Sequence, residues 1–499
     1  MKMSELLAGL PLLGDLPPQL GQKDVKGLDY DSRRIEQDYL FFAFAGAHAD
    51  GSAFAAQAAA RGAIAIISEQ QAPPGGFEAP WIQVTHGRET LAVTAKRFYG
   101  NLDEKLLLTG ITGTNGKTTI SYLIDSVLRA AGKTTALIGT IEYHLGAKIL
   151  RAVNTTPESL DLHRLFAELD AMGGTQVTME VSSHALALKR VYALRFRTAV
   201  FSNLTRDHLD FHKSMEDYFA AKQLLFTGSG GPPPEHAVIN RDDEWGRKLG
   251  TVSGRPEVLW YGMGPESAIR ARHVNSSLNG LRFEVVFGKT KLDIRSRLMG
   301  RFNVYNILAA CGAGFSYGIS PEVIAKGISA VEGVPGRFEQ VDEGQPFAVI
   351  VDYSHTDDAL RNAISAARNL NPRRVITLFG CGGDRDRAKR PLMGQAAGEL
   401  SDIVILTSDN PRSEDPLQIM NDAMVGLRRT DAKISVEPDR ALAIGKAIEE
   451  ARAGDIVLLA GKGHETYQIF RDRTIHFDDR EVARESLRAY GFERKAGVQ

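Results

Sequence analysis

The run LLLTGITGTNGKTT, residues 106–119, decides the expected fold, because an apolar strand leads through a glycine-containing loop directly into a helix. Apolar residues continue at helical spacing from Ile120 to Ala131, and Gly132 is placed to end that helix. Glycines let the backbone curl around a phosphate with its N–H groups pointing inward, and the helix N-terminus adds a favourable dipole. The sequence therefore predicts a phosphate site at the edge of an α/β sheet.

The predicted phosphate loop indicates ATP as the ligand. We expect Lys117 to reach the outer phosphates and the Thr118 hydroxyl to ligate Mg²⁺. The strict pattern G-x-x-x-x-G-K-[ST] is not met, because Ile111 stands six residues before Lys117. The alternative is a glycine-rich turn with an exposed lysine, which the preceding strand and the following helix disfavour. The loop residues expected to contact ATP are Gly113, Thr114, Asn115, Gly116, Lys117, Thr118 and Thr119.

Apolar strand candidates alternate with helical stretches along the chain, which predicts an α/β protein with mostly parallel sheets. Four of these candidates, between residues 347 and 460, each run into a cluster of polar residues. Ligands bind outside the carboxyl ends of the strands in open α/β sheets, so we expect one binding edge there. The clusters are residues 352–355, 380–387, 408–412 and 461–465.

Composition limits the class of protein. The length of 499 residues predicts two or three domains, and blocks of sequence begin near residues 103 and 336. A net charge of -1 gives no indication of a nucleic-acid or membrane partner. Only Cys311 and Cys381 are present, which fits a reducing compartment. No signal peptide and no apolar run near the ~20 residues of a membrane span are found, so we expect a cytoplasmic protein, and a monomer.

Three side chains outside the loop are candidates for holding a metal ion beside the phosphates. Glu180 ends the apolar strand 176–181, which would place its carboxylate at the edge that carries the phosphate loop. His208 follows the next strand, and for it a role in loop packing is an equal alternative. Lys222 lies on the apolar stripe of the expected helix 214–226, where a lysine either snorkels or is desolvated with a lowered pKa. A desolvated amine captures CO₂ as a carbamate, which is a possible metal ligand.

Longer motifs together resemble the Mur ligases of peptidoglycan synthesis, in collinear order over essentially the whole chain. They are GTNGKTT (113–119), MEVSSH (179–184), NLTRDHLDFH (203–212), RFNVYN (301–306), PGRFE (335–339) and DYSHTDDAL (352–360). Three more narrow the resemblance to the MurE type, namely DYDSRRI (29–35), GCGGDRDRAKRPLM (380–393) and GKGHE (461–465). Asp357 stands where many members have proline, and we expect only the local turn to differ.

The resemblance implies three domains: 1–102 for the UDP moiety, 103–335 for ATP and a Rossmann-like domain, 336–499, for an amino acid. It implies catalytic roles for Lys117, His208 and Lys222, the last as the carbamylated lysine of the family. The implied metal ligands are Thr118, Glu180, His208 and the Lys222 carbamate, and Asn303, Asn306, Arg337 and Asp352 would surround the nucleotide. Ser32 would contact the UDP-sugar, and Asn154, Thr155, Thr156, Ser182 and Arg190 the muramoyl-dipeptide.

The choice of amino acid is implied by residues Asp409, Asn410, Pro411 and Arg412, whose D-N-P-R form is similar to that of members adding meso-diaminopimelate. The fork of Arg412 matches the distal carboxylate of that substrate, which lysine lacks. Arg385, Gly461 and Glu465 would complete the pocket, with Glu465 suited to the distal ammonium. The expected partners are therefore meso-diaminopimelate and UDP-MurNAc-L-Ala-D-Glu.

The implied reaction transfers the γ-phosphoryl group of ATP to the D-glutamate γ-carboxylate, and the incoming amine then displaces phosphate. Two other ligases are alternatives: an L-lysine-adding member of the same type and a folylpolyglutamate-type ligase. The D-N-P-R segment disfavours the first, and the N-terminal UDP-site motif disfavours the second. A nucleotide-gated regulatory protein is a third alternative, which ADP release dependent on both other substrates would exclude.

Overall fold

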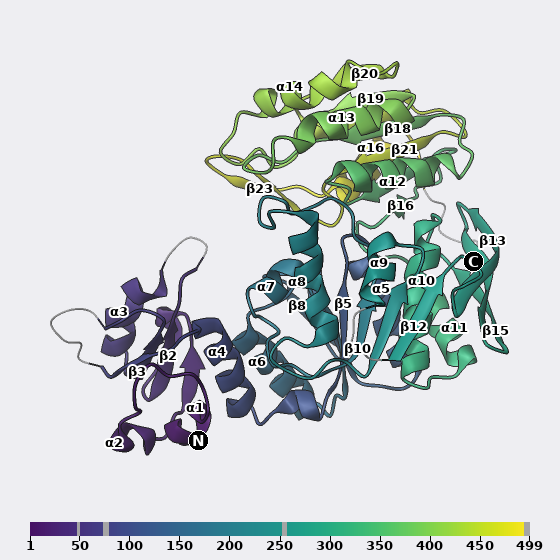
Figure 1. The fold of residues 1–499 in the computed structure, drawn as a ribbon. Helices are drawn as coiled ribbons and strands as arrows, with labels where there is room; N and C mark the ends of the chain where they lie inside the picture. The colour runs from purple at the N-terminus through teal and green to yellow at the C-terminus, as the bar shows by residue number, and fades with distance from the viewer. Residues whose placement is uncertain (47–49, 73–78, 252–256, 494–499) are drawn as a thin grey trace.

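The computed structural model describes residues 1–46, 50–72, 79–251 and 257–493. Three large sheets succeed one another along this part of the chain, each covered by its own helices (Figure 1). This alternation of strands and helices confirms the predicted α/β class. Within the same residues, no helix combines the length and the apolar composition that a membrane span requires.

The first sheet is built from short elements. They are α1 (Met3–Leu7), α2 (Pro18–Gly21), β1 (Gly27–Asp29), η1 (Ser32–Arg34), β2 (Tyr39–Ala43), η2 (Gly51–Phe54), α3 (Ala55–Ala60), β3 (Ala63–Ser68), β4 (Trp81–Gln83) and α4 (Gly87–Phe98). The strands run parallel in the order β1-β2-β3-β4. Both faces are apolar because helices cover both: Leu40 and Ile67 pack toward α1 and α4, whereas Phe41 and Ile66 pack toward α3.

The second sheet is the largest, with 11 strands among the described residues. Its strands are β5 (Leu107–Thr112), β6 (Thr135–Ile138), β7 (Glu142–Leu145), β8 (Lys148–Arg151), β9 (Gln176–Glu180), β10 (Phe196–Phe201), β11 (His236–Asn240), β12 (Glu257–Gly262), β13 (Ile269–Ser277), β14 (Gly280–Phe287) and β15 (Thr290–Ser296). Its helices are η3 (Leu102–Glu104), α5 (Lys117–Ala130), α6 (Ser159–Ala171), α7 (Ser183–Ala187), α8 (Met215–Thr227), α9 (Glu244–Leu249), α10 (Phe302–Ser316) and α11 (Pro321–Ser329).

The middle of the second sheet is parallel, in the order β12-β11-β10-β5-β9-β6, as predicted for this block. Antiparallel ribbons extend it at both ends, β13-β14-β15 on one side and β7-β8 on the other. These ribbons were not predicted, and they make the whole sheet mixed. Strand β15 alternates buried and exposed residues, so it contains no continuous apolar run that would reveal it.

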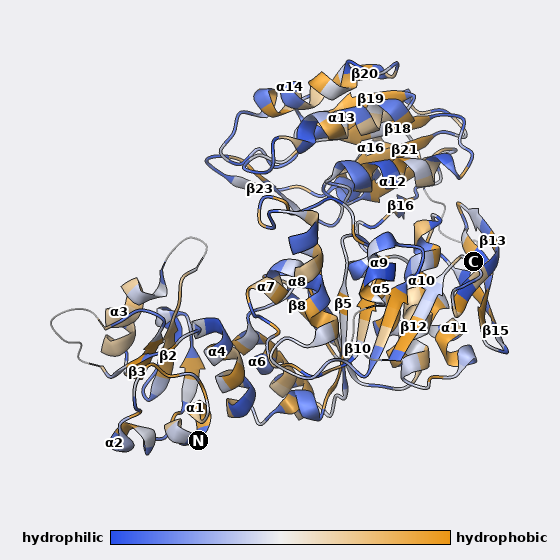
Figure 2. Cartoon of the chain, viewed as in Figure 1, coloured by the Kyte–Doolittle hydropathy of each residue, from blue (hydrophilic) through white to orange (hydrophobic). Residues whose placement is uncertain are grey.

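Helices cover both faces of the second sheet and enclose two apolar cores. Helices α5, α10 and α11 bury Ile124, Leu308 and Ile328 on one face, and α6 and α8 bury Phe166 and Leu225 on the other. The strands between them are largely orange in Figure 2, as expected for a sheet that is covered on both sides. The cores therefore hold the strand ends, where polar side chains begin, in fixed positions.

The third sheet has the order β16-β17-β21-β18-β19-β20 and is parallel except for β16. Its elements are β16 (Glu339–Val341), β17 (Ala348–Asp352), α12 (Asp357–Arg368), β18 (Val375–Phe379), α13 (Lys389–Leu400), β19 (Ile403–Leu406), α14 (Pro416–Leu427), β20 (Lys433–Val436), α15 (Arg440–Glu450), β21 (Ile456–Ala460) and α16 (Asp479–Ala489), with a separate hairpin of β22 (Tyr467–Ile469) and β23 (Thr474–His476). Helices α12, α13 and α14 cover one face and α15 and α16 the other, which is the arrangement of a Rossmann-like sheet.

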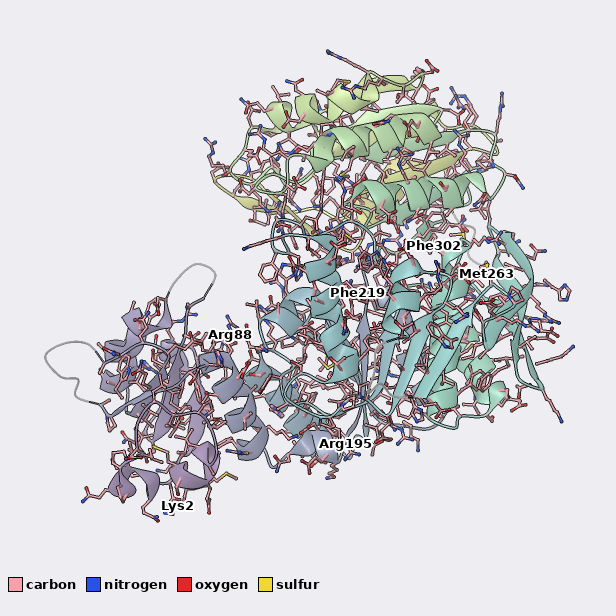
Figure 3. All side chains as sticks on the ribbon, viewed as in Figure 1. Lys2, Arg88, Arg195, Phe219, Met263 and Phe302 are labelled. Atoms are coloured by element: carbon pink, nitrogen blue, oxygen red, sulfur yellow. The ribbon has the colours of Figure 1, made fainter. Side chains whose placement is uncertain are left out.

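Side chains at the two boundaries join the three parts. Phe302, labelled below the third sheet in Figure 3, packs on the core of that sheet, with its ring centroid 5.6 Å from that of Phe338. Arg88, labelled between the first and second sheets, lies 2.9 Å from the carboxylate of Glu158. Each boundary thus combines packing or an ion pair with the chain connection itself.

A buried ion pair holds two strand ends of the third sheet. Arg440 Nη2 lies 2.6 Å from Asp479 Oδ2, and both side chains are 0% exposed. The same guanidinium donates to the carbonyls of Ser408 at 3.4 Å and Ala460 at 3.0 Å. Because Ser408 begins one polar cluster and Ala460 directly precedes another, Arg440 fixes the clusters at 408–412 and 461–465 relative to each other.

Asp479→Ala should destabilise the third sheet strongly, because it leaves the Arg440 guanidinium buried without its anion. Loss of one partner of a buried pair costs about 3–5 kcal/mol. The measurement is the urea midpoint of unfolding followed by circular dichroism. The control is Glu399→Ala, which breaks the exposed pair with Arg361 and should cost less than about 1 kcal/mol. Equal shifts in the two variants would show that Arg440 does not depend on Asp479.

Candidate active site

The predicted phosphate loop runs from the end of β5 into α5, and two of its positions require glycine. Gly113 has a φ of +147°, and a Cβ there would lie 1.9 Å from Ser202 Oγ. Gly116 has a φ of +91°, and a Cβ there would lie 2.5 Å from Asn306 Oδ1. The segment after β10 and helix α10 therefore press against the loop so closely that no side chain fits at these two positions.

Asn203, which the sequence analysis did not single out, holds the loop from the side. Its backbone carbonyl accepts the N–H of Thr114 at 2.8 Å, and its Oδ1 accepts the N–H of Asn115 at 2.9 Å. Helix α5 then begins without a side-chain cap from any described residue, which leaves its first N–H groups for an anion. The motif NLTRDH contains Asn203, but only the fold brings it to the loop.

Two ammonium groups meet at one carbonyl of the loop. Lys117 Nζ lies 2.9 Å and Lys222 Nζ 2.8 Å from the oxygen of Gly113. Lys117 is partly exposed, whereas Lys222 is 1% exposed. Burial, and then the charge of Lys117, hold the pKa of Lys222 well below its ordinary value. The desolvated interpretation of Lys222 is therefore confirmed over snorkelling, while its carbamylation stays a prediction.

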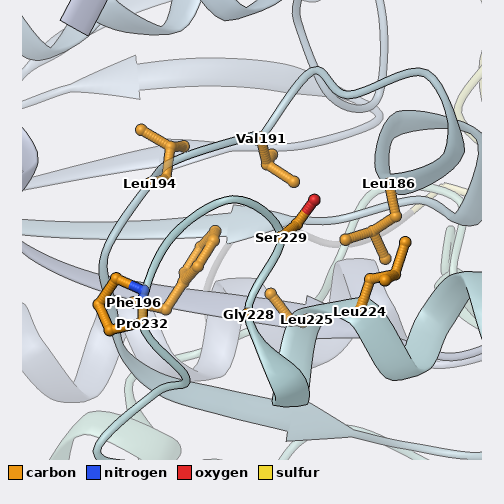
Figure 4. Close-up of a pocket in the computed structure, with 9 residues that line it drawn as sticks. All are labelled: Leu186, Val191, Leu194, Phe196, Leu224, Leu225, Gly228, Ser229 and Pro232. Atoms are coloured by element: carbon orange, nitrogen blue, oxygen red, sulfur yellow. The ribbon is translucent and has the colours of Figure 1, made fainter. Parts of the chain in front are cut away.

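Apolar contacts fix the helix that carries Lys222. Leu225 on α8 lies with Leu186 and Phe196 around a small apolar hollow between α8 and the segments next to α7 (Figure 4). On the side of the loop, the Lys222 ammonium lies 4.5 Å from the ring centroid of Tyr218, one turn earlier. The apolar stripe predicted from the sequence thus directs the amine toward the phosphate loop.

The residues predicted to hold a metal ion offer suitable donor atoms. Thr140 holds both oxygens of Glu180, through its N–H at 2.8 Å and its hydroxyl at 3.0 Å. Burial lowers the pKa of His208 to about 3, so its imidazole is neutral at pH 7 and has a lone pair to offer. The oxygen donors are of the kind that a magnesium ion prefers, and the neutral imidazole is a further electron-pair donor.

These donors do not form a preassembled cluster of acidic and histidine residues. Across the described ranges, no group of three or more His, Cys, Asp or Glu side chains could hold a metal. A cation would therefore also need the Thr118 hydroxyl, which accepts from Arg337 at 3.2 Å, and an anionic form of Lys222. An unmodified Lys222 ammonium has no electron pair to donate, so the predicted set of four ligands requires the carbamate of Lys222.

The four residues predicted around the nucleotide divide into two groups. Arg337 and Asn306 reach α5 and the loop directly, as described above. Asn303 is buried behind Asn306 and accepts its Nδ2 at 2.8 Å. Asp352 accepts the N–H of Phe338 at 2.8 Å, and burial raises the pKa of its carboxyl. In this structure Asn303 and Asp352 therefore orient the neighbours of the loop.

Most of the residues predicted to bind the dipeptide lie beside Glu180. The Thr156 hydroxyl donates to the Glu180 carbonyl at 2.9 Å and accepts the N–H of Ser182 at 3.1 Å. Arg190 Nη1 donates to the Thr156 carbonyl at 3.0 Å. Thr155 also lies near Glu180, because its hydroxyl is 3.1 Å from that of Thr140. These contacts place a row of hydroxyl groups next to the predicted metal donors.

Asn154 and Ser32 are held by other elements. Asn154 begins the row and donates its N–H to the Tyr143 hydroxyl at 3.1 Å. Ser32 belongs to the first sheet, where its hydroxyl donates to Gln57 Oε1 at 2.8 Å. The structure therefore places Asn154 at the row of hydroxyls and Ser32 on a separate part of the chain.

The predicted amino-acid pocket has a cationic side around Gly382. Arg412 Nη1 donates to the Gly383 carbonyl at 2.7 Å, and a Cβ at Gly382 would lie 3.0 Å from that nitrogen. The same Cβ would lie 3.6 Å from Arg385 Cγ, so both arginines border one small residue. Arg385 is exposed and Arg412 half-buried, which leaves both able to meet a carboxylate.

The other side of this pocket is acidic. Asn410 Nδ2 donates to Glu465 Oε2 at 2.8 Å, and a Cβ at Gly461 would lie 3.2 Å from Asp409 Oδ2. The structure thus brings the D-N-P-R segment together with residues of GKGHE, as predicted from their positions at strand ends. Pro411 lies between the two sides, its carbonyl against Gly383. A ligand with a carboxylate and an ammonium matches this arrangement.

Polar contacts cross from the second sheet to the third beside the phosphate loop. Asp358 at the start of α12 accepts from Asn115 Nδ2 at 3.1 Å and from the Thr205 hydroxyl at 2.9 Å. Lys389 Nζ lies 2.6 Å from Asp207 Oδ1. Burial opposes ionisation of Asp207, but His208 and His355, which carry a charge once protonated at low pH, and the ammonium of Lys389 hold its pKa below the ordinary value. Asp358 and Lys389 lie within the motifs at 352–360 and 380–393, but the sequence analysis did not single them out as bridging residues.

Comparison with known families agrees with this geometry. Residues 24–99 match the Mur ligase family catalytic domain, residues 111–314 the Mur ligase middle domain, and residues 336–463 the Mur ligase glutamate ligase domain. A curated relative from Solibacter usitatus is 66% identical over 492 residues, covering 99% of each chain. The chain therefore belongs to the Mur ligase family.

The relatives point to one member of that family. The Solibacter protein is named UDP-N-acetylmuramoyl-L-alanyl-D-glutamate--2,6-diaminopimelate ligase, as is a protein from Geobacillus kaustophilus that is 45% identical over 495 residues, 98% of this chain and all of that one. A solved structure of a ligase with the same name aligns with a TM-score of 0.71 at 33% identity, over 98% of this chain and 99% of its own. MurF from Thermotoga maritima in complex with ADP shares the fold, with a TM-score of 0.63 at 18% identity, over 89% of this chain and 95% of that one.

Lys117→Ala should lower the affinity for inorganic triphosphate by at least about tenfold, because it removes the cation that the loop carbonyls hold at the helix start. Isothermal titration calorimetry measures the effect. The matched control is Lys133→Ala, an exposed lysine just beyond α5. Equal affinities in the two variants would contradict the assignment of the phosphate loop.

Proposed function

We propose that the chain uses ATP to join meso-2,6-diaminopimelate to UDP-N-acetylmuramoyl-L-alanyl-D-glutamate. Full-length relatives that carry this name, one of them 66% identical, support the reaction. The observation that carries the choice of substrate is the pocket with Arg412 on one side and Glu465 on the other. Diaminopimelate has a carboxylate and an ammonium at its distal end, so it complements both sides. The chain is thus an amide-bond-forming ligase of peptidoglycan precursor synthesis.

The loop and its lysines provide the chemistry of the first step. The N–H groups at the start of α5 and the ammonium of Lys117 bind and neutralise the phosphates of ATP. The γ-phosphoryl group passes to the γ-carboxylate of D-glutamate, which the row from Asn154 to Arg190 would position. The amine of diaminopimelate then attacks the acyl phosphate, and inorganic phosphate leaves. The pocket of the third sheet would hold this amine toward the loop.

We assign Mg²⁺ to the donors Thr118, Glu180, His208 and the Lys222 carbamate. When bound there, the ion would offset the charge that develops on the transferred phosphoryl group. Glu180 is held by Thr140, and His208 is neutral, so both are ready to donate electron pairs. Lys117, His208 and Lys222 are the residues to which we assign catalytic roles.

The division of labour follows the three sheets. We assign residues 1–102, with Ser32, to the UDP moiety, residues 103–335 to ATP, and residues 336–499 to the amino acid. The predicted ATP contacts of residues 113–119 and of Asn303, Asn306, Arg337 and Asp352 fall under the same proposal. We also propose that the protein is cytoplasmic, where nucleotide substrates are made, and that it is a monomer.

The alternative ligases are less well supported. Folylpolyglutamate synthase from Mycobacterium tuberculosis shares the fold, at 15% identity and a TM-score of 0.61, and this likeness concerns the fold alone. An L-lysine-adding enzyme would leave the two arginines at Gly382 without a carboxylate. Leaving a charged group unpaired in a pocket disfavours the substrate that lacks its partner.

Lys222→Ala should reduce turnover by at least about a hundredfold, because no carbamate can form to complete the metal donors. Small carboxylic acids in the buffer should restore part of the activity by supplying the missing anion. Labelling with ¹³C-bicarbonate should give a carbamate signal in the wild type that the variant lacks. Lys213→Ala, an exposed lysine just before α8, is the control. A crystal structure with the substrates bound and an unmodified Lys222 would contradict the predicted carbamate.

Arg412→Ala should raise the KM for diaminopimelate steeply and leave that for ATP nearly unchanged. Loss of a desolvated charge pair costs on the order of 2–5 kcal/mol. The measurement compares kcat/KM for diaminopimelate and L-lysine in the wild type and the variant, with UDP-MurNAc-L-Ala-D-Glu, ATP and product masses. Arg428→Ala, exposed after α14, is the control. If the wild type prefers lysine, or if the ratio of kcat/KM for the two amino acids is the same in the wild type and in Arg412→Ala, the lysine-adding alternative replaces the proposal.

A further inference from the structure

Lys462, in the glycine-flanked loop after β21, is not an exposed ligand-binding lysine. Its side chain is 0% exposed, although glycines stand on both sides of it. Gly463 has a φ of +55°, and a Cβ there would lie 2.6 Å from Tyr353 Cβ. The loop is therefore packed tightly against the neighbouring strand end, and the lysine side chain is turned into the protein.

The Lys462 ammonium is surrounded by acceptors of the amino-acid pocket. Nζ lies 2.5 Å from the Tyr467 carbonyl and 3.2 Å from Glu465 Oε2. It lies 3.4 Å from Asn410 Oδ1 and 3.6 Å from Asp409 Oδ1. An ammonium has three N–H donors, and these acceptors use all of them. Lys462 therefore has no donor left for a substrate, and any effect it has must pass through its neighbours.

Those neighbours include two carboxylates that share this one cation. Asp409 is 7% exposed, and its Oδ1 has no hydrogen-bond donor among the described residues. The Lys462 ammonium, 3.6 Å away, therefore compensates the negative charge of this carboxylate. Burial, and then the charge of Asp409, raise the pKa of Glu465, while Lys462 opposes the rise. Other charged or titratable groups that act on Glu465 or its pocket are Arg440, Tyr353 and Tyr467. Without Lys462, the two carboxylates would face each other in a desolvated place with no cation between them.

We propose that Lys462 is a positioning residue for the amino-acid substrate: its buried ammonium holds the Glu465 carboxylate beside Asp409 and fixes it toward the distal ammonium of the substrate. This inference rests on the proposed function and adds a residue to its specificity. Asn410 takes part from the other side, because it donates to Glu465 and lies against the same ammonium. One buried cation thus lies between the two carboxylates and orients the acidic side of the pocket.

The test is the steady-state kinetics of the full-length Lys462→Met variant. KM for diaminopimelate should rise by at least about tenfold, whereas KM for ATP and for the UDP-dipeptide should change less than about threefold. If the methionine variant does not fold, Lys462→Gln takes its place: it keeps a hydrogen-bond donor but no charge, and it should show the same selective rise in KM for diaminopimelate. The control Lys96→Met removes another largely buried lysine, paired with Asp103, and should lower stability without this selective change in KM.

A double-mutant cycle decides whether Lys462 acts through Glu465. In the Glu465→Gln background, Lys462→Met should raise KM for diaminopimelate less than about twofold further. Additive effects, or an equal rise in KM for all substrates, would overturn the inference. Failure of the proposed function looks different, because the wild type itself would then not ligate diaminopimelate. If the wild type uses diaminopimelate and Lys462→Met leaves its KM unchanged, only the inference on Lys462 is wrong.

Discussion

The pair of lysines at the Gly113 carbonyl is the constraint on which the site depends. Neither Lys117 nor Lys222 has a carboxylate within 4.0 Å in the described parts of the chain, although one is buried and the other half-buried. Two like charges so close together in a desolvated place are costly unless an anion joins them or one group gives up its proton. Burial lowers the pKa of both lysines, and the charge of Lys117 lowers that of Lys222 further. A bound phosphate chain, or the proposed carbamate, would relieve this cost.

The architecture directs strand ends of the second sheet and strand ends of the third sheet toward one another. Strands β5, β9 and β10 of the second sheet end at the phosphate loop, at Glu180 and at Asn203. Strands β18, β19 and β21 of the third sheet end near the residues of the proposed amino-acid pocket, and β17 ends at Asp352. In each parallel sheet the carboxyl edge is where ligands bind, and here the contacts of Asp358 and Lys389 join the two edges. In the proposed reaction, the phosphorylated carboxylate and the attacking amine would be bound at different sheets, and these contacts would bring the two binding sites together.

Sequence patterns predicted the elements that depend on local chemistry. The strand, loop and helix around residues 106–130 are seen as expected, because glycine positions and helical spacing are local properties. Burial of Lys222 was also readable, since its neighbours on the helix are apolar. The antiparallel ribbons of the second sheet were missed because strands such as β15, which alternates buried and exposed residues, and β8, which is mostly exposed, contain no continuous apolar run. Asn203, Asp358 and Lys462 were missed for another reason: each acts on residues far away in the chain, and only tertiary packing reveals the contact.

Asp357 illustrates how a local departure gains a distant effect. It was expected to alter only a turn, yet its carboxylate lies 3.0 Å from Arg206, which belongs to the second sheet. A proline at the first position of a helix stiffens the backbone and has no charge to offer. Aspartate gives up that stiffness for an attraction between two separately folded parts, and the pair is open to solvent. Salt should therefore weaken one attraction between the second and third sheets, namely the pair of Asp357 and Arg206, which a proline at position 357 would not form.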